Sequence, residues 1–555
     1  MHTCKKCQTQ YEITEDDLIF YDKLSPVFDG KKFSIPPPQF CPECRLQRRL
    51  AFRNERKLYH RNCDLTGKPI LSIYAPESPY KVYDINAWWS DKWDALAFGR
   101  DFDFSKTLSQ QLKELYHDVP HVALYSTNIE NSEYTNFVLN QKNCYLIFGA
   151  GNNEDCMYGK FIVYCKDVVD CLAVYSCELC YEGVASERCY NCKFFNNCKN
   201  CSDCIMIEDC SACNDCIGCF GLRNKQYYIL NRAYSREEYE KIKQEYEYLT
   251  PAKITFIKQQ LDILKQKLPH IGSHIYASEN CTGESIYNSK NCLNSFDCTN
   301  CEDCKYISFS PKTVYTQDNT FCAPDGNRFC YNLCSTVGLE NSMSNFFVWY
   351  GGNNYYSMNC HHNNDIFACV GLRNKKYCIL NKQYTPEEYG KLVAKIIEHM
   401  QKTGEWGDYF PFEISPFAYN ETIAQEYFPI TQAEATHMGS TWKNEQENIE
   451  TPSIFTPPED IRNVDENICN QVLQCEITGK KYKITPQELV FYKKMKLPIP
   501  RAHSDQRHYN RLKSHNFYKL WDGKCIKCGT NIKTVYPPEQ QATVYCEKCY
   551  LQIIY

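Results

Sequence analysis

Residues 177–219 read CELCYEGVASERCYNCKFFNNCKNCSDCIMIEDCSACNDCIGC. They end a longer run, residues 144–219, in which every cysteine stands at a position divisible by three. A three-residue phase kept over this length gives each cysteine an equivalent place in a repeating backbone, which is typical of a stacked repeat and not of disulfide loops. The fifteen cysteines are Cys144, Cys156, Cys165, Cys171, Cys177, Cys180, Cys189, Cys192, Cys198, Cys201, Cys204, Cys210, Cys213, Cys216 and Cys219.

Short apolar runs lie between these cysteines, such as YLIF at 145–148 and CLAVY at 171–175, and they alternate with Asn, Asp, Gly and Ser. This pattern predicts short strands and tight corners. A β-solenoid fits best, because a reduced cysteine behaves as a small hydrophobe and forms ladders through such a core. The alternative is that neighbouring thiols bind a metal or an iron–sulfur cluster. We favour the ladder, since a phase set by packing need not bring four sulfurs to one point.

The middle of the chain is duplicated. The sequence IGCFGLRNKQYYILNRAYSREEY, from Ile217, returns as FACVGLRNKKYCILNKQYTPEEY, from Phe367, at an offset of 150. Nearer the start of each copy the offset is 148. We therefore expect two solenoid units, residues 121–250 and 271–403, joined by a helix in residues 251–270.

Each unit is expected to close with a capping helix. Ser235 with Glu238, and Thr385 with Glu388, form capping boxes at the helix starts. In the second unit the cysteine phase is interpreted as kept only through Cys304 and lost afterwards.

The two ends of the chain are also copies of each other. From Cys41 to Trp88 the N-terminal copy matches the C-terminal copy at a constant offset of 462, and upstream of this segment the offset is 471. We interpret residues 1–105 and 467–555 as two zinc-ribbon modules. The segment 404–466, rich in aromatics and prolines, is interpreted as a strap and linker, with its clearest linker from Glu445 to Asp465.

Each module keeps one set of four cysteines as paired CxxC motifs. Four thiolates on two tight turns close a tetrahedral zinc site with no open coordination position, so we expect two structural zinc ions. The predicted ligands are Cys4, Cys7, Cys41 and Cys44 in the first module and Cys525, Cys528, Cys546 and Cys549 in the second.

The other site of each module is degenerate. Cys475, Thr478, His503 and Gln506 stand where the first site would recur, and Cys63, Thr66, Asp84 and Ala87 stand where the second would. We interpret these residues as replacements after metal loss and not as weak ligands.

Basic residues gather beside both sites, although the chain has a formal charge of −5 and a pI near 6.3. Lysine and arginine among aromatic residues suit contact with phosphates and stacking on unpaired bases. The alternatives are a solvated helix face and a surface for an acidic partner. The predicted nucleic-acid contacts are Arg45, Arg48, Arg49, Arg53, Arg56, Lys57, Arg507, Arg511, Lys513 and Lys519.

The chain begins MHTCKKCQTQ, without a signal peptide, and no stretch approaches the length of an apolar membrane span. We expect a cytoplasmic protein without a membrane partner, in which thiols stay reduced. No Walker loop, Rossmann glycine pattern or catalytic triad is recognisable.

Five segments carry a resemblance to a known family. They are CPECRLQRRLAFRNERKLYHRNCDLTGK (41–68), PYKVYDINAWWSDKWDALAFGRDFDF (79–104), the repeated GLRNK, SPFAYNETIAQEYFP (415–429) and KCGTNIKTVYPPEQQATVYCEKCYLQIIY (527–555). The chain resembles an uncharacterised family of zinc-ribbon, cysteine-rich repeat proteins of candidate-phyla-radiation bacteria. The resemblance implies a bacterial cytoplasmic origin and brings no activity with it.

The sequence thus predicts a mixed, mainly β protein, with zinc-ribbon modules flanking a duplicated cysteine-rich β-solenoid with capping helices. The preferred function is a non-catalytic zinc-binding scaffold that engages RNA, a ribonucleoprotein or DNA through the basic modules. One alternative is a protein assembly platform built on the solenoid. The other is a redox or metal-cluster protein that uses the solenoid cysteines.

Overall fold

The computed structural model describes residues 1–322, 324–444, 455–515 and 518–554. The chain forms two compact units, each made of two segments that are distant in sequence. Unit 1 contains Met1–Leu124 and His274–Asn444, and unit 2 contains Tyr125–Ser273 and Glu445–Tyr555. The N-terminal module therefore shares a unit with the second repeat, and the C-terminal module shares one with the first. This crosswise pairing was not expected from the linear order of the modules.

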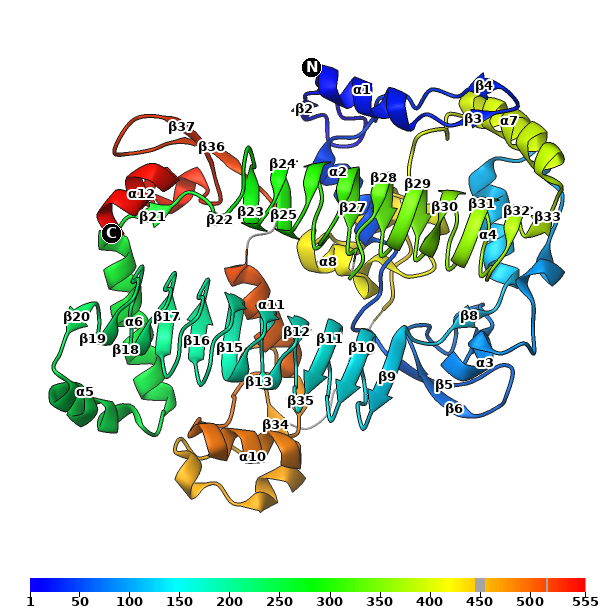
Figure 1. The fold of residues 1–555 in the computed structure, drawn as a ribbon. Helices are drawn as coiled ribbons and strands as arrows, with labels where there is room; N and C mark the ends of the chain where they lie inside the picture. The colour runs from blue at the N-terminus through cyan, green and yellow to red at the C-terminus, as the bar shows by residue number, and fades with distance from the viewer. Residues whose placement is uncertain (323, 445–454, 516–517, 555) are drawn as a thin grey trace. The chain divides into compact units, whose positions relative to one another are not determined.

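The first repeat, called stack 1, lies in unit 2 and consists of short parallel strands (Figure 1). A final antiparallel strand, β20 (Arg232–Ala233), pairs with β19. The parallel strands are β9 (Ser126–Glu130), β10 (Asn136–Lys142), β11 (Phe148–Glu154), β12 (Lys160–Val163), β13 (Lys166–Val169), β14 (Leu172–Tyr175), β15 (Glu178–Glu187), β16 (Lys193–Asn196), β17 (Ile205–Glu208), β18 (Asn214–Ile217) and β19 (Gln226–Ile229).

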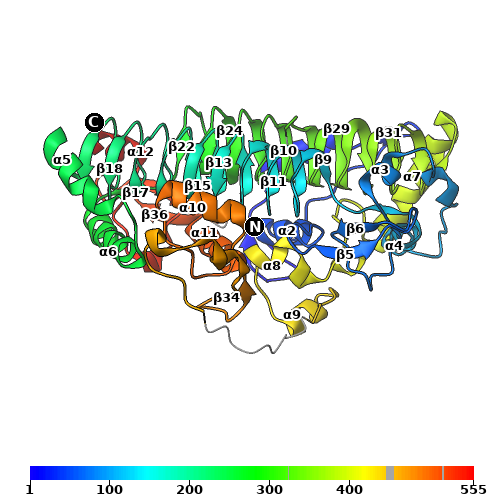
Figure 2. The same ribbon diagram turned by 90° about the horizontal axis from the view of Figure 1, so that it is seen from below.

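Every parallel pair in stack 1 has the same register, in which a residue pairs with the one 12 positions further on. Asn136 pairs with Phe148, Phe148 with Lys160, and Lys160 with Leu172. The chain therefore advances by one rung of the stack every 12 residues. Figure 2 shows these rungs following one another along the stack.

The backbone of stack 1 turns at every third residue. From Asn128 to Tyr227 each third position has a positive φ, near 50° at most of them. Asparagine and aspartate tolerate this left-handed conformation better than other residues with a Cβ. They also bond to each other between rungs, as where the Asn191 side chain donates to Asp203 at 2.7 Å. Most Asn and Asp residues of stack 1 therefore mark corners, as predicted.

The inward cysteine follows each corner directly. All fifteen cysteines of residues 144–219 are buried. The thiol of Cys192 donates to the carbonyl oxygen of Tyr190 at 3.3 Å and lies 3.5 Å from the carbonyl oxygen of Cys201 in the next rung. The same two contacts recur along the stack, so the thiols fill the core and satisfy their own weak donors.

The second repeat, called stack 2, lies in unit 1 and pairs in the same way. Its strands are β22 (Ile275–Tyr276), β23 (Gly283–Tyr287), β24 (Lys290–Leu293), β25 (Ser295–Thr299), β26 (Glu302–Lys305), β27 (Val314–Thr320), β28 (Arg328–Cys334), β29 (Val337–Phe346), β30 (Trp349–Tyr355), β31 (His361–Phe367), β32 (Lys376–Ile379) and the antiparallel β33 (Lys382–Gln383).

The interpretation that stack 2 loses its phase after Cys304 is wrong. Val314 pairs with Arg328, a register of 14 residues, whereas the following rungs return to 12. Two extra residues in this one rung displace the later cysteines by two positions, and the 12-residue repeat continues after it. Before the insertion the positions of Cys292, Cys298, Cys301 and Cys304 each leave a remainder of one when divided by three. Beyond it four buried cysteines share a new phase, at positions divisible by three, namely Cys330, Cys360, Cys369 and Cys378.

The two terminal modules have matching elements, as the sequence repeat predicts. In unit 1 they are β1 (His2–Thr3), β2 (Gln10–Tyr11), α1 (Glu15–Leu24), β3 (Val27–Phe28), β4 (Lys31–Lys32), α2 (Pro42–Leu50), β5 (Tyr59–Asn62), β6 (Pro69–Ser72), β7 (Val82–Tyr83), α3 (Ile85–Trp89), α4 (Leu108–Asp118) and β8 (His121–Val122). In unit 2 they are β34 (Leu473–Gln474), β35 (Lys481–Tyr482), α10 (Pro486–Met495), α11 (Ser504–Ser514), β36 (Trp521–Lys524), β37 (Asn531–Thr534), β38 (Val544–Tyr545) and α12 (Glu547–Ile554).

The closing helices begin where the capping boxes predict. The boxes at Ser235 and Thr385 start α5 (Arg236–Lys243) and α7 (Pro386–Thr403). The linking helix is α6 (Pro251–Lys267), and it leads to β21 (His270–Ile271), which pairs with β38.

The strap packs on the N-terminal module. It contains α8 (Ile423–Tyr427) and α9 (Gln432–His437), and the hydroxyl of Tyr419 accepts a hydrogen bond from the Gln47 side chain at 2.7 Å. Of the predicted linker from Glu445 to Asp465, residues 445–454 lie outside the described residues. The rest is packed, because Ile461 and Val464 are buried in one apolar cluster with α10.

Strand residues outnumber helical residues, so the mixed class with many strands is confirmed. None of the described helices combines the length and the apolar character of a membrane-spanning segment.

The corners give a direct test of the fold. Asn197 has a φ of 49°, so Asn197→Val should lower the free energy of unfolding by about 1–3 kcal/mol, because a β-branched residue is strained there. Asn197→Gly should change it by less than about 1 kcal/mol. Urea unfolding followed by circular dichroism measures both, and an unaffected Val variant would contradict the corner assignment.

Candidate metal centres

The first four-cysteine group joins a tight hairpin to the start of a helix in unit 1. Cys4 and Cys7 lie in the turn between β1 and β2, whereas Cys41 is the N-cap of α2 and Cys44 lies in its first turn. The four Sγ atoms all lie within 4.8 Å of one another, and those of Cys7 and Cys41 are 3.6 Å apart.

The second group repeats this arrangement in unit 2 with the other half of the module. Cys525 and Cys528 lie in the turn between β36 and β37, and Cys546 and Cys549 lie at the start of α12. The sulfurs of Cys528 and Cys546 are 3.8 Å apart. A tetrahedral zinc with bonds of about 2.3 Å separates its sulfurs by about 3.8 Å, so both groups fit a structural metal ion.

Each group contains a thiol whose pKa is lowered well below its usual value, whereas the pKa of Cys44 and of Cys549 is raised. The pKa of Cys41 is lowered to about 5, chiefly by its hydrogen bond with the Cys44 thiol. The pKa of Cys528 is lowered to about 6, first by its side-chain hydrogen bond with Thr530. A helix N-terminus also favours negative charge, and a metal ion displaces the protons that remain.

The degenerate sites keep the backbone turn but lack the full set of four metal ligands. In all four turns the amide of the fifth residue donates to the carbonyl oxygen of the first, as Gly67 does to Cys63 at 2.8 Å and Gly479 to Cys475 at 2.9 Å. The facing helices use other caps: the Asp84 side chain accepts from the amide of Ala87, and His503 Nδ1 accepts from the amide of Asp505. The local fold therefore survives without the metal.

The cysteines of the two stacks form no comparable centre. Within the described chain, three or more metal-ligating side chains gather around one point in the two terminal groups and in no set of stack cysteines. A stack thiol has thiol neighbours in its own rung and in the adjacent rungs, as Cys201 has in Cys189, Cys198 and Cys213, but these sulfurs extend in rows and do not surround one point. This geometry favours the ladder over the iron–sulfur alternative.

Two of the three predicted nucleic-acid residues of α2, Arg45 and Arg49, are buried in unit 1. Arg45 Nε lies 2.8 Å and Arg49 Nη1 lies 3.0 Å from the two carboxylate oxygens of Asp318, which is 0% exposed. Arg49 also donates to the side chain of Asn332 at 3.2 Å. The guanidinium of Arg45 lies over the ring of Tyr306 at 5.1 Å. We call this group the arginine clamp of unit 1.

Unit 2 contains the same clamp. Arg507 Nε lies 3.2 Å and Arg511 Nη1 lies 2.9 Å from the two carboxylate oxygens of Asp170, which is also 0% exposed. Arg511 pairs with Glu182 at 3.1 Å, and Arg507 lies over the ring of Tyr158 at 4.7 Å. The partners of unit 1 recur here at the repeat offsets, with Glu182 in the place of Asn332. Burial raises the pKa of Glu182 to about 7.

A second contact fixes the other half of each module, and it uses the repeated GLRNK sequence. In unit 1, Arg373 of this sequence donates to the backbone oxygen of Trp88 at 2.9 Å. In unit 2, Tyr550, the counterpart of Trp88, donates to Asp209 at 2.7 Å, and Asp209 forms an ion pair with Arg223 of the same sequence. Each module thus holds its stack at two places.

The prediction that the arginine clusters contact nucleic acid is corrected by this burial. A buried guanidinium paired with a carboxylate has no surface to offer a phosphate, so Arg45, Arg49, Arg507 and Arg511 are structural. Arg53 is buried as well, where it donates to Glu55 at 2.7 Å. Three predicted residues are half-buried, namely Arg48, Arg56 and Lys57, and two are exposed, namely Lys513 and Lys519.

Sequence reasoning missed the acceptors Asp170 and Asp318. A signal for them exists, since these aspartates correspond at the repeat offset of 148 and the arginine pairs correspond at the offset of 462. An aspartate is present in both copies of the apolar stack, and an arginine pair is present in both copies of the helix. This double correspondence indicates that the aspartate and the arginines form an ion pair in each copy.

Comparison of the chain with protein-family models, with curated proteins and with solved structures found no match. The function is therefore argued from the residues and their geometry.

The metal content tests the two groups. We expect two zinc ions per chain in protein purified without oxygen, and one ion in Cys528→Ser, because three thiolates hold the metal more weakly than four. Cys63→Ser is the matched control, since Cys63 belongs to a degenerate site, and it should keep two ions. Elemental analysis scaled to sulfur measures the ratio. Iron, or a third ion, would contradict the assignment.

The clamp makes a second prediction. Asp318→Asn keeps the side-chain size but leaves two buried guanidiniums without their anion, so it should lower the free energy of unfolding by about 3–5 kcal/mol. Glu398→Gln is the control: its ion pair with Lys31 is exposed, and its loss should cost less than about 1 kcal/mol. Equal denaturation midpoints for the two variants would refute the structural role of Asp318.

Proposed function

We propose that the protein is a non-catalytic, zinc-braced scaffold that contacts nucleic acid through the C-terminal module. The observation that carries the proposal is a set of exposed lysines interleaved with the ligands of the second metal group. Lys524 and Lys527 flank Cys525, and Lys548 lies between Cys546 and Cys549; all three lysines are exposed.

The charge of this module supports the proposal. Residues 467–555 contain fifteen lysines and arginines against six aspartates and glutamates, although the whole chain is acidic. Two of the arginines are used in the clamp, so the lysines supply most of the surface charge. Lys513 is exposed and lies 4.5 Å from the centre of the Tyr509 ring, and Tyr509 is 40% exposed. Cations beside an exposed ring suit a single-stranded nucleic acid.

Comparison of the two modules indicates that the fold does not require these lysines. At the offset of 462, Lys524, Lys527 and Lys548 correspond to Asn62, Leu65 and Asn86, and that copy lacks the metal ligands. The same turn therefore forms without the positive charges. The competing explanation is that the lysines only balance the charge of a metal with four thiolates, and the experiment distinguishes the two.

We further infer that the 12-residue rungs are the coils of a β-solenoid. A left-handed residue at every third position supplies four corners in each rung, and the inward residue follows each corner. We also propose a reducing, cytoplasmic setting and membership of the zinc-ribbon, repeat family that the sequence resembles. All described cysteines are free thiols, which supports the reducing setting.

The test changes three lysines at once. Replacing Lys524, Lys527 and Lys548 by Gln should weaken binding of a fluorescent single-stranded RNA and lower the slope of log K against log salt by about 2, at about 0.7 for each lost contact. Fluorescence anisotropy at several salt concentrations measures the affinity and the slope.

The control removes three lysines from the same module, at the turn that has lost its metal: Lys480, Lys481 and Lys483, each to Gln. It should leave the slope unchanged. Zinc is measured in parallel. Loss of zinc affinity with no change in RNA binding would reject the nucleic-acid proposal and support charge balance alone.

A further inference from the structure

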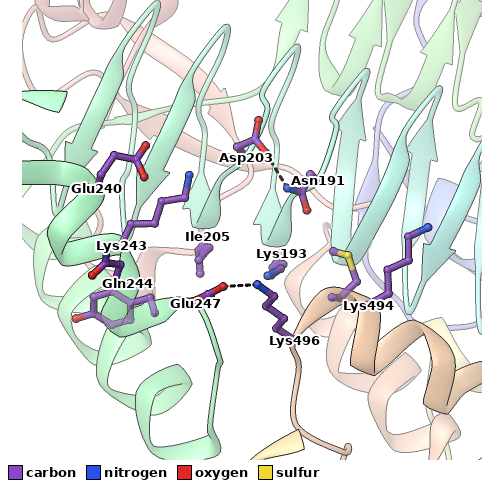
Figure 3. A pocket seen from close by; sticks show the side chains of 12 residues that line it. Asn191, Lys193, Asp203, Ile205, Glu240, Lys243, Gln244, Glu247, Lys494 and Lys496 are labelled. Atoms are coloured by element: carbon purple, nitrogen blue, oxygen red, sulfur yellow. Dashed lines mark hydrogen bonds and ion pairs between the residues drawn. The ribbon is translucent and has the colours of Figure 1, made fainter. Parts of the chain in front are cut away.

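Unit 2 contains a pocket that the proposed function does not use. Its volume is about 380 Å³, within the range of small-molecule sites. Figure 3 shows it bounded by the strands β16 and β17, by α5 with the turn η2 (Gln244–Tyr246), and by the end of α10. The charged side chains that line it are Lys193, Asp203, Glu240, Lys243, Glu247, Lys494 and Lys496.

Lys193 is out of place on the strand that carries it. In the register of stack 1 it lies between Tyr181 and Ile205, and the next residue of this column is Ile217. All three neighbours are buried in the apolar cluster beneath the C-terminal module. A lysine in such a column is costly unless its charge has a partner.

The other lysines of the pocket have partners, whereas Lys193 has none among the described residues. Lys496 pairs with Glu247, Lys243 with Asp215 at 2.9 Å, and Lys494 with Asp167 at 3.0 Å. The ammonium of Lys193 makes no hydrogen bond or ion pair with the described part of the chain, and the positive charge of Lys496, which lines the same pocket (Figure 3), acts against it.

Unit 1 shows that the fold does not require this lysine. At the offset of 150, Lys193 corresponds to Met343, Lys243 to Val393 and Glu247 to Ile397. All three apolar residues are 0% exposed. The same place is thus a closed apolar core in one unit and an open, charged pocket in the other. A difference of this kind between two copies of one architecture indicates a ligand.

We propose that the pocket of unit 2 binds a small phosphate-bearing molecule, with the phosphate on Lys193. Lys243 and Lys496 supply two further ammonium groups, and lysine binds phosphate as a point charge. Tyr246 lines the same pocket and offers a ring for the organic part of a phosphate ester. The inference is independent of nucleic-acid binding at the metal group, because it uses none of the same residues.

The charge state of Lys193 fits this role. Burial, and then the charges of Lys496 and Lys243, lower its pKa to about 8, whereas Asp203 opposes the shift. A bound phosphate restores the ammonium form. Phosphate affinity should therefore fall as the pH rises above 8, and binding near pH 8 should take up a proton.

Isothermal titration with inorganic phosphate and with AMP tests the proposal. We expect saturable binding that weakens at least tenfold in Lys193→Met, a variant that copies the residue of unit 1, and that persists in Lys193→Arg. Tighter binding of AMP than of phosphate would identify an ester that uses Tyr246, and equal affinities would identify phosphate alone.

Lys483→Met is the matched control, because Lys483 is an exposed lysine of unit 2 outside the pocket, and it should bind as the unchanged protein does. Titrations at pH 8 in two buffers of different ionisation enthalpy report the proton uptake, which a merely structural lysine would not produce. The proposal is overturned if neither probe binds at millimolar concentration, or if Lys193→Met binds as tightly as the unchanged protein.

Discussion

The buried carboxylate that receives two arginines is the interaction on which each unit depends. Asp318 and Asp170 sit at left-handed corners of their stacks, and each is 0% exposed only because a module covers it. A lone carboxylate or a lone arginine pair in that position would lack its counter-charge. The stack and the module are therefore stable in this form only together, which explains why each unit combines segments that are far apart in the sequence.

The two four-cysteine groups lie at different helices of the two modules. In unit 1 the ligands Cys41 and Cys44 begin α2, the helix that carries the clamp arginines. In unit 2 the corresponding helix begins at a His503 cap, and the metal ligands instead begin α12, which carries Tyr550 to its contact with Asp209. Each module has a four-cysteine group at one of its two points of contact with the stack, and an ordinary helix cap at the other.

Local signals in the sequence predicted the local structure. The cysteine phase indicated the rungs, the CxxC pairs indicated the metal groups, and the capping boxes at Ser235 and Thr385 marked two helix starts. The pairing of modules with stacks could not be predicted in this way, because the partners are 269 residues apart in the case of Arg49 and Asp318. In a helix of mixed polarity, the sequence pattern also does not distinguish a buried arginine from an exposed one. The role assigned to the arginines was wrong for that reason.

The separation of the clamp partners has a consequence for synthesis on the ribosome. Arg49 is synthesised 269 residues before Asp318, which at about 5–20 residues per second is a delay of about 13 to 54 s. During that time the arginine face of α2 has no partner from its own chain. A nascent molecule therefore exposes a strongly basic helix that the finished one conceals, and this interval is when the first module is open to wrong associations or to protection by a chaperone.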